Sequence, residues 1–216
     1  MKSIWFLIGP PGSKWSSFAN LLSLSMDDID LSDHTSDRFF QHREHITHQG
    51  AYFGPGFGAG EQWHNTEYVT RSNILKDIGE VWDLGNDNIK LVKSHVLALN
   101  LERLRCEFPE SKFIFVLRPL ERCLKGWTGA GGFDKITYPD YRSYYQNLET
   151  LREKLTEEHS AISSYIEKQN LKLKAYSGDT FIREFSIAQS VLNNSKFSSL
   201  DIHLLSYRDV QFAIEN

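Results

Sequence analysis

The stretch SIWFLIGPPGSKWSSFANLLSL, residues 3–24, decides the fold of this chain. It begins with a short apolar run that ends at a Gly-Pro-Pro turn, a pattern typical of a strand buried on both faces of a parallel sheet. Beyond the turn, Phe18, Leu21 and Leu22 recur at the spacing of one helix face. A buried strand, a glycine-containing turn and a helix in this order predict the beginning of an α/β domain.

Two later runs have the same pattern as this first strand. IKLVKS at residues 89–94 and KFIFVL at residues 112–117 are short, apolar and followed by helical patterns. A run at residues 171–176 predicts a fourth strand, and residues 139–169 give the longest helical signal, apolar on one side and charged on the other. Alternating strands and helices predict one α/β domain over residues 1–216, built of three layers around a central, mainly parallel sheet.

Composition limits the classes of function. The chain has 216 residues and a formal net charge of -4, which argues against a nucleic-acid-binding protein that works through an overall basic field. Two cysteines, Cys106 and Cys123, are too few for a disulfide framework and match no metal spacing. No run reaches the ~18 apolar residues of a transmembrane helix, and the first apolar run is too short for a signal peptide. We therefore expect a soluble, cytoplasmic protein.

The turn GPPGSKWSS, residues 9–17, looks like a phosphate-binding loop with one change. A nucleotide loop of the form G-x-x-x-x-G-K-[ST] carries Ser or Thr directly after its lysine. Here Lys14 comes one residue earlier and is followed by Trp15. Such a turn still directs backbone N–H groups and the positive end of a helix dipole at an anion, and Ser16 and Ser17 add hydroxyls. An ordinary strand-to-helix turn is the alternative.

Charged residues stand where the two later strands end. In KLVKSH, alternation places Lys93 and His95 on the same side of the chain at the carboxyl end of the strand. Arg118 follows the next strand, directly before a new helix, where a planar guanidinium suits a phosphate. This edge is where ligands of open α/β sheets bind. Each residue alone leaves the function open, because such a histidine is often structural and such an arginine often forms a surface ion pair.

Taken in chain order, the three pieces resemble the sulfotransferase family. The resemblance covers roughly residues 2–133, and the wording KLVKSH…FPESKFIFVLRP…GAGGF looks especially like the short sulfotransferase-like proteins of marine phages. It implies a P-loop NTPase-like sulfotransferase fold and 3′-phosphoadenosine 5′-phosphosulfate (PAPS) as sulfuryl donor, with 3′-phosphoadenosine 5′-phosphate (PAP) as product and no metal. The implied acceptor is a small molecule, carbohydrate or peptide, without nucleic acid or membrane. A phage protein of this kind would act in the host cytoplasm.

The resemblance also implies a role for each matching residue. His95 would take the acceptor's proton as general base, and Lys93 and Lys14 would stabilise charge on the leaving phosphate. Arg118 would hold the 3′-phosphate. A serine that helps it in the family falls on Gly126 here, or on Lys125 if the shorter Arg-Pro is counted. The 5′-phosphosulfate would lie on the loop, formed by Pro11, Gly12, Ser13, Lys14, Trp15, Ser16 and Ser17.

Two other functions stay open. A P-loop kinase of a small molecule or nucleotide is disfavoured because Lys14 lacks a following Ser or Thr, and because the strand before Arg118 offers no aspartate for magnesium. A catalytically inactive nucleotide-binding module of the same fold is the other alternative, since the loop departs from the family pattern.

Two further patterns predict surroundings of the site. HREHITH, residues 42–48, predicts a polar helix near the substrate entrance, with His42, His45 and His48 as a less favoured metal site. A glycine-rich stretch at residues 50–63 predicts a loop that orders around a ligand. Its side chains would line an acceptor pocket or simply pack the loop down, and they include Tyr52, Phe53, Phe57 and Trp63, with His64 next to them and Phe133 as a second wall.

Overall fold

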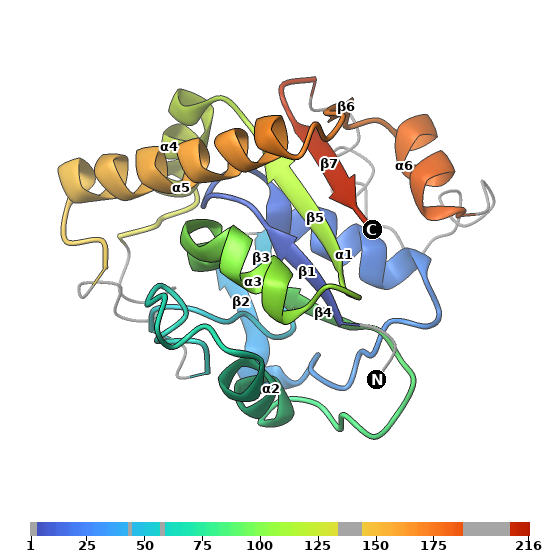
Figure 1. Ribbon diagram of the computed structural model, residues 1–216. Helices are drawn as coiled ribbons and strands as arrows, with labels where there is room; N and C mark the ends of the chain where they lie inside the picture. Colours follow the sequence, from blue (N-terminus) through green and yellow to red (C-terminus); the bar gives the residue numbers. More distant parts are fainter. Residues whose placement is uncertain (1–3, 43–44, 57–58, 134–143, 188–207) are drawn as a thin grey trace.

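The computed structural model describes residues 4–42, 45–56, 59–133, 144–187 and 208–216 (Figure 1). These residues form a mixed five-stranded sheet in the order β4-β1-β5-β7-β6. Strand β1 is parallel to β4 on one side and to β5 on the other. β7 is antiparallel to β5, and β6 is antiparallel to β7. The strands are β1 (Ile4–Ile8), β4 (Lys90–Lys93), β5 (Lys112–Leu117), β6 (Lys174–Ala175) and β7 (Gln211–Glu215).

The α/β fold is thus confirmed, but the predicted mainly parallel sheet is a mixed one. The three strands that carry the sequence motifs, β4, β1 and β5, pair in parallel, whereas β7 is antiparallel to both of its neighbours. The strand predicted at residues 171–176 is only two residues long, β6 at Lys174–Ala175. β7 occupies the place beside β5 and reverses the direction of the sheet there. Its sequence, QFAIE, lies in a C-terminal region whose pattern is too irregular to assign, and antiparallel strands often extend a parallel sheet at one side.

Helices cover both faces of the sheet, because side chains alternate along each strand. Phe6 faces the apolar cluster made with α2, α3 and α5, whereas Leu7 faces the cluster made with α1 and α6. Figure 1 shows α3 and α5 in front of the sheet, with α4 next to α5. The helices are α1 (Trp15–Ser25), α2 (Arg71–Gly79), α3 (Leu101–Glu107), α4 (Leu120–Gly129), α5 (Leu148–Lys168) and α6 (Gly178–Phe185), with 3₁₀ turns η1 (Ser36–Arg38) and η2 (Val96–Asn100).

The long helix α5 begins at Leu148 because Asn147 caps it. The side-chain oxygen of Asn147 accepts hydrogen bonds from the backbone N–H groups of Glu149 and Thr150, at 2.9 and 3.0 Å. The hydroxyl of Thr150 accepts the N–H of Asn147 in return, which completes a capping box. The predicted helix at residues 139–169 is confirmed for this part, and residues 139–143 lie outside the described residues.

The predicted polar helix around the histidines is wrong. Residues 39–42 (β2, Phe39–His42) and 45–49 (β3, His45–Gln49) form an antiparallel hairpin in which His42 pairs with His45. The sequences FFQH and HITHQ are rich in aromatic and β-branched residues, which favour strands over helices. Within the described part of the chain, no group of three or more His, Cys, Asp or Glu residues is arranged to hold a metal ion.

A buried ion pair ties the beginning of β4 to the segment after α1. Lys90 Nζ donates to Asp30 Oδ2 at 2.7 Å, and both side chains are buried. Burial opposes ionisation of Asp30, but hydrogen bonds from Lys90, Ser32 and Asn86 outweigh it and hold the pKa of Asp30 well below its usual value of 3.8. The ionised Asp30 therefore depends on the Lys90 ammonium, and loss of that cation leaves an unpaired charge in the interior.

Lys90→Met will lower the free energy of unfolding at pH 7 by about 3–5 kcal/mol, because it leaves a buried carboxylate without its cation. Urea unfolding measures the difference, and Lys172→Met, at an exposed position, removes the same charge as a control. Since the pKa of Asp30 is lower in the folded state than in the unfolded chain, its contribution is present above pH 3.8 and is lost as the pH falls further. The difference between variant and wild type should therefore narrow in acid. Equal stabilities at pH 7 would contradict this account.

Candidate active site

The loop after β1 is a tight turn that packs against α4. Gly12 has φ of +81°, a conformation that favours glycine, and a Cβ there would lie 2.0 Å from the carbonyl oxygen of Cys123. Lys14, directly before α1, also has positive φ, at 75°. Because lysine has no acceptor atom, its side chain cannot cap the N–H groups of the first helical turn. The loop residues Pro11, Ser13 and Trp15 are buried, and Gly12, Lys14, Ser16 and Ser17 are half-buried.

Two buried hydroxyls stand at this edge of the sheet. Ser13 lies in the loop after β1, and Ser94 directly follows the neighbouring strand β4. Both are fully buried, and neither Oγ atom has a hydrogen-bond partner among the described residues. A buried polar atom without a partner costs about 1–3 kcal/mol. Such hydroxyls are suited to binding the oxygen of a ligand, so the residues at this edge fit a phosphate or sulfate group.

His95 lies one residue beyond Ser94 and is 2% exposed. Its Nδ1 is 2.7 Å from Oε1 of Glu158 on α5, which is itself fully buried. The hydroxyl of Tyr145 is 3.3 Å from the same Nδ1, and the hydroxyl of Tyr144 donates to Glu158 Oε1 at 3.0 Å. The imidazole is therefore anchored through one nitrogen, and toward the described residues its Nε2 makes no hydrogen bond.

Aromatic rings surround His95 and connect it to the loop. The ring of Trp15, the first residue of α1, lies 6.4 Å from the imidazole, measured between centroids. Tyr52 lies 5.7 Å away and nearly parallel, at 13°. Tyr144 and Tyr145 lie 5.7 and 5.9 Å away. These rings exclude water from most of the imidazole and place it next to the beginning of α1.

Lys93 is buried and directed toward the segment before Tyr52. Its Nζ donates a hydrogen bond to the carbonyl oxygen of Gln49. Burial lowers the pKa of Lys93 to about 8, and the charge of Asp33 partly opposes this shift. Among the described residues, the Lys93 ammonium makes no hydrogen bond to the loop at residues 9–17.

Arg118 lies on the other side of the loop, where β5 ends. It is 9% exposed, and its Nε donates to Asp209 Oδ2 at 2.9 Å. A Cβ on Gly126 would lie 3.5 Å from Arg118 Nη1 and 2.9 Å from the carbonyl oxygen of Gly12, so the guanidinium and the loop meet at this point of α4. Lys125, the neighbouring residue on α4, is exposed. Gly126, rather than Lys125, is thus the α4 position next to Arg118.

The aromatic residues of the glycine-rich stretch are largely packed into the core. Phe53 and Trp63 are fully buried and stack in parallel with centroids 4.7 Å apart. Tyr52 is buried as well but reaches His95. His64 is exposed, and Phe133 is 44% exposed while its ring contacts Trp127. Packing accounts for Phe53 and Trp63, and Phe57 lies outside the described residues.

Glu158 and Asp209 are two residues that sequence reasoning missed. Glu158 carries a signal that was available: it continues the apolar spacing of Leu151, Leu155 and Ile162 along α5, where a charge is out of place. Asp209 carries no such signal, because nothing in its neighbourhood indicates that it reaches a strand end more than 90 residues earlier.

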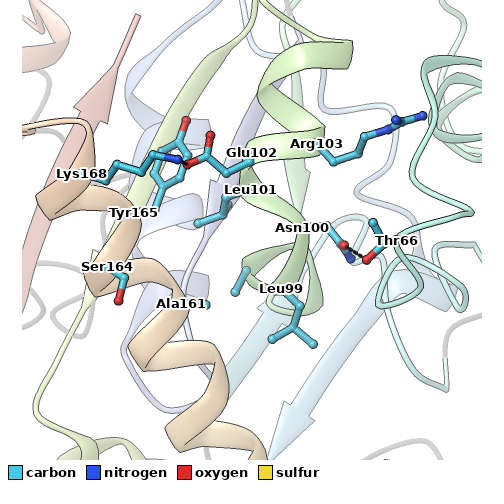
Figure 2. A pocket seen from close by; sticks show the side chains of 11 residues that line it. Thr66, Leu99, Asn100, Leu101, Glu102, Arg103, Ala161, Ser164, Tyr165 and Lys168 are labelled. Atoms are coloured by element: carbon cyan, nitrogen blue, oxygen red, sulfur yellow. Dashed lines mark hydrogen bonds and ion pairs between the residues drawn. The ribbon is translucent and has the colours of Figure 1, made fainter.

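A cavity of about 360 Å³ lies elsewhere, between α3 and α5 (Figure 2). Four of its polar side chains are paired with one another: Thr66 donates to Asn100 at 2.5 Å, and Lys168 lies 2.7 Å from Glu102. It contains none of the predicted site residues. The residues that line it are Thr66, Ala98, Leu99, Asn100, Leu101, Glu102, Arg103, Ala161, Ser164, Tyr165 and Lys168.

Comparisons with known proteins give no family. No protein-family model, no curated protein and no solved structure matches this chain. No helix among the described residues is long and apolar enough to cross a membrane. The function must therefore be argued from the geometry at the carboxyl edge of β1, β4 and β5.

Proposed function

We propose that this protein is a PAPS-dependent sulfotransferase with the P-loop NTPase-like sulfotransferase fold over residues 1–216. One observation carries the proposal. Because β1 lies between β4 and β5 and is parallel to both, the loop after β1 is flanked by His95 on one side and Arg118 on the other. Trp15 contacts His95, and Gly12 meets Arg118 at Gly126. An anion on the loop would have a base on one side and an arginine on the other, which suits a nucleotide with a 5′-phosphosulfate and a 3′-phosphate.

The proposed reaction moves one sulfuryl group and one proton. The acceptor's oxygen or nitrogen attacks sulfur as the bond from sulfur to the bridging oxygen breaks, and the electron pair of that bond stays on the phosphate of PAP. The proton of the acceptor passes to Nε2 of His95, which later releases it to solvent. The loop N–H groups, Ser13 and Lys14 stabilise charge on the leaving phosphate, and Arg118 holds the 3′-phosphate. No metal is required in this scheme.

A second candidate is a nucleotide-binding module of the same fold without activity. The observation that favours it is that both predicted cations already have partners in the chain. Lys93 donates to the carbonyl oxygen of Gln49, and Arg118 is paired with Asp209. In an active enzyme Lys93 would have to leave Gln49 in order to reach the sulfuryl group.

Calorimetry with PAP and with ATP tests the proposal. We expect the full chain to bind PAP without magnesium, and to transfer ³⁵S-labelled sulfuryl from PAPS to at least one member of a panel of phenols, sugars and peptides. Binding of ATP but not of PAP, with turnover that requires magnesium, would overturn the proposal in favour of a P-loop kinase. Binding of PAP without transfer to any acceptor would favour the inactive module.

A further inference from the structure

Glu158 is a buried carboxyl group on a helix face that otherwise carries apolar side chains. In α5, which the structure describes throughout, it shares the buried face with Leu151, Leu155, Ile162 and Ile166. Removing a carboxylate from water costs several kcal/mol, and well-packed apolar residues often stabilise such a position better. Stability alone therefore does not explain a glutamate here, and its contacts must be considered.

Those contacts favour a proton on one nitrogen of His95, Nδ1. When Glu158 is ionised, its carboxylate only accepts hydrogen bonds, so the 2.7 Å contact from Oε1 to His95 Nδ1 is then made by a proton on Nδ1. Tyr144 donates to the same oxygen at 3.0 Å. Burial, and then the charge of Glu158, raise the pKa of the Tyr144 phenol, which keeps it protonated as a donor. With Nδ1 protonated, a neutral imidazole has its lone pair on Nε2.

We propose that Glu158 is a positioning residue for His95, an assignment that rests on the proposed function. By holding the proton on Nδ1, Glu158 presents Nε2 as the base for the acceptor's proton. As the new bond to sulfur forms and the bond to the bridging oxygen breaks, that proton moves to Nε2. The resulting imidazolium keeps its Nδ1 proton and is stabilised by the carboxylate, which does not itself become protonated.

A purely structural role for Glu158 makes a different prediction. If the contact only fastens α5 to the segment after β4, its loss reduces stability but leaves the choice of tautomer and the catalytic rate per folded molecule unchanged. The tautomer of His95 therefore separates the two roles, and it can be measured whether or not the acceptor is known.

Glu158→Gln is the variant that tests the proposal, because glutamine keeps the shape of the side chain but brings an amide that can donate as well as accept. The ¹⁵N spectrum of histidine-labelled protein should show Nδ1–H for His95 in the wild type and a shift toward Nε2–H in the variant. The His95 signal is assigned from its absence in a His95→Gln spectrum. Turnover should fall by about 10²- to 10⁴-fold, in line with the loss of an orienting carboxylate, with PAP affinity unchanged.

Glu157→Gln is the matched control, since Glu157 is the exposed neighbour on α5 and, among the described residues, forms an ion pair with Lys154 on the surface. It should change neither spectrum nor rate. Nε2–H in the wild-type protein would overturn the assignment, even if Glu158→Gln failed to fold. So would an active Glu158→Gln protein with wild-type turnover. If the wild type has the Nδ1–H tautomer but transfers no sulfuryl group, the proposed function fails while the positioning of His95 by Glu158 stands.

Discussion

Replacing His95 with alanine will reduce sulfuryl transfer by about 10²- to 10⁴-fold, the range that general base catalysis contributes, while PAP binds as tightly as to the wild type. The separation is expected because the ring of His95 lies next to that of Trp15 but, among the described residues, makes no hydrogen bond to the loop or to Arg118. An acceptor whose proton has no base must lose it to water, which slows the chemical step. Single-turnover transfer from ³⁵S-labelled PAPS measures this step, and calorimetry with PAP measures the affinity.

Two further measurements separate a loss of the base from a loss of folding. His95→Ala removes the imidazole partner of the buried Glu158, which keeps only the Tyr144 hydroxyl among the described residues, and will lower stability. His95→Gln retains a donor for the carboxylate and controls for folding. In addition, His95→Ala opens a space of imidazole size between Tyr52 and Tyr145, so added imidazole should restore part of the rate. Transfer at the wild-type rate by His95→Ala would show that another group is the base.

The three parallel strands were predictable because each is a compact apolar run with a local turn signal behind it. β1, β4 and β5 begin and end within a residue or two of the predicted runs. Parallel pairing placed the loop after β1, His95 and Arg118 at the same edge of the sheet. The position of β1 between β4 and β5 was not predicted and comes from the structure. Gly12 was likewise identified from the loop pattern, and its positive φ and close approach to Cys123 explain why glycine occurs there.

Partners contributed by distant elements were not predictable. Glu158 meets His95 across 63 residues, and the meeting depends on how α5 crosses the sheet, which periodicity does not specify. The helical spacing shows that Glu158 occupies a position where an apolar residue is expected, but it does not indicate which residue Glu158 contacts. The direction of the Lys93 side chain depends on β3 and the backbone around Gln49, in a segment where strand-forming residues were interpreted as a helix.

Replacing Arg118 with alanine will weaken PAP binding by about 10- to 100-fold, the loss expected when a charge-assisted hydrogen bond of about 1.5–3 kcal/mol is removed. The geometry divides the guanidinium between two tasks. Its Nε is held by Asp209, while Nη1 lies at the Gly126 position that also meets the loop. Calorimetry with PAP measures the change. The PAP affinity of Arg118→Lys should lie between those of the wild type and of Arg118→Ala, because lysine keeps the charge but loses the planar fork.

Arg122→Ala provides a matched control for Arg118→Ala. Arg122 lies 3.7 Å from the same Asp209 but is 63% exposed, so its removal takes away an arginine from the same carboxylate without touching the loop. We expect its effect on PAP affinity to be less than twofold, because a screened surface pair contributes little.

Adenosine 5′-phosphate decides whether Arg118 binds the 3′-phosphate or supports the loop in general. A ligand without the 3′-phosphate should bind equally well to the wild type and to Arg118→Ala, so the variant should lose affinity for PAP alone. Asp209 is 28% exposed and can be hydrated when its partner is removed, so the effect should appear in binding rather than in folding. If both ligands weakened equally, Arg118 would instead hold the 5′-group or the loop, and the 3′-phosphate would need another partner at this edge.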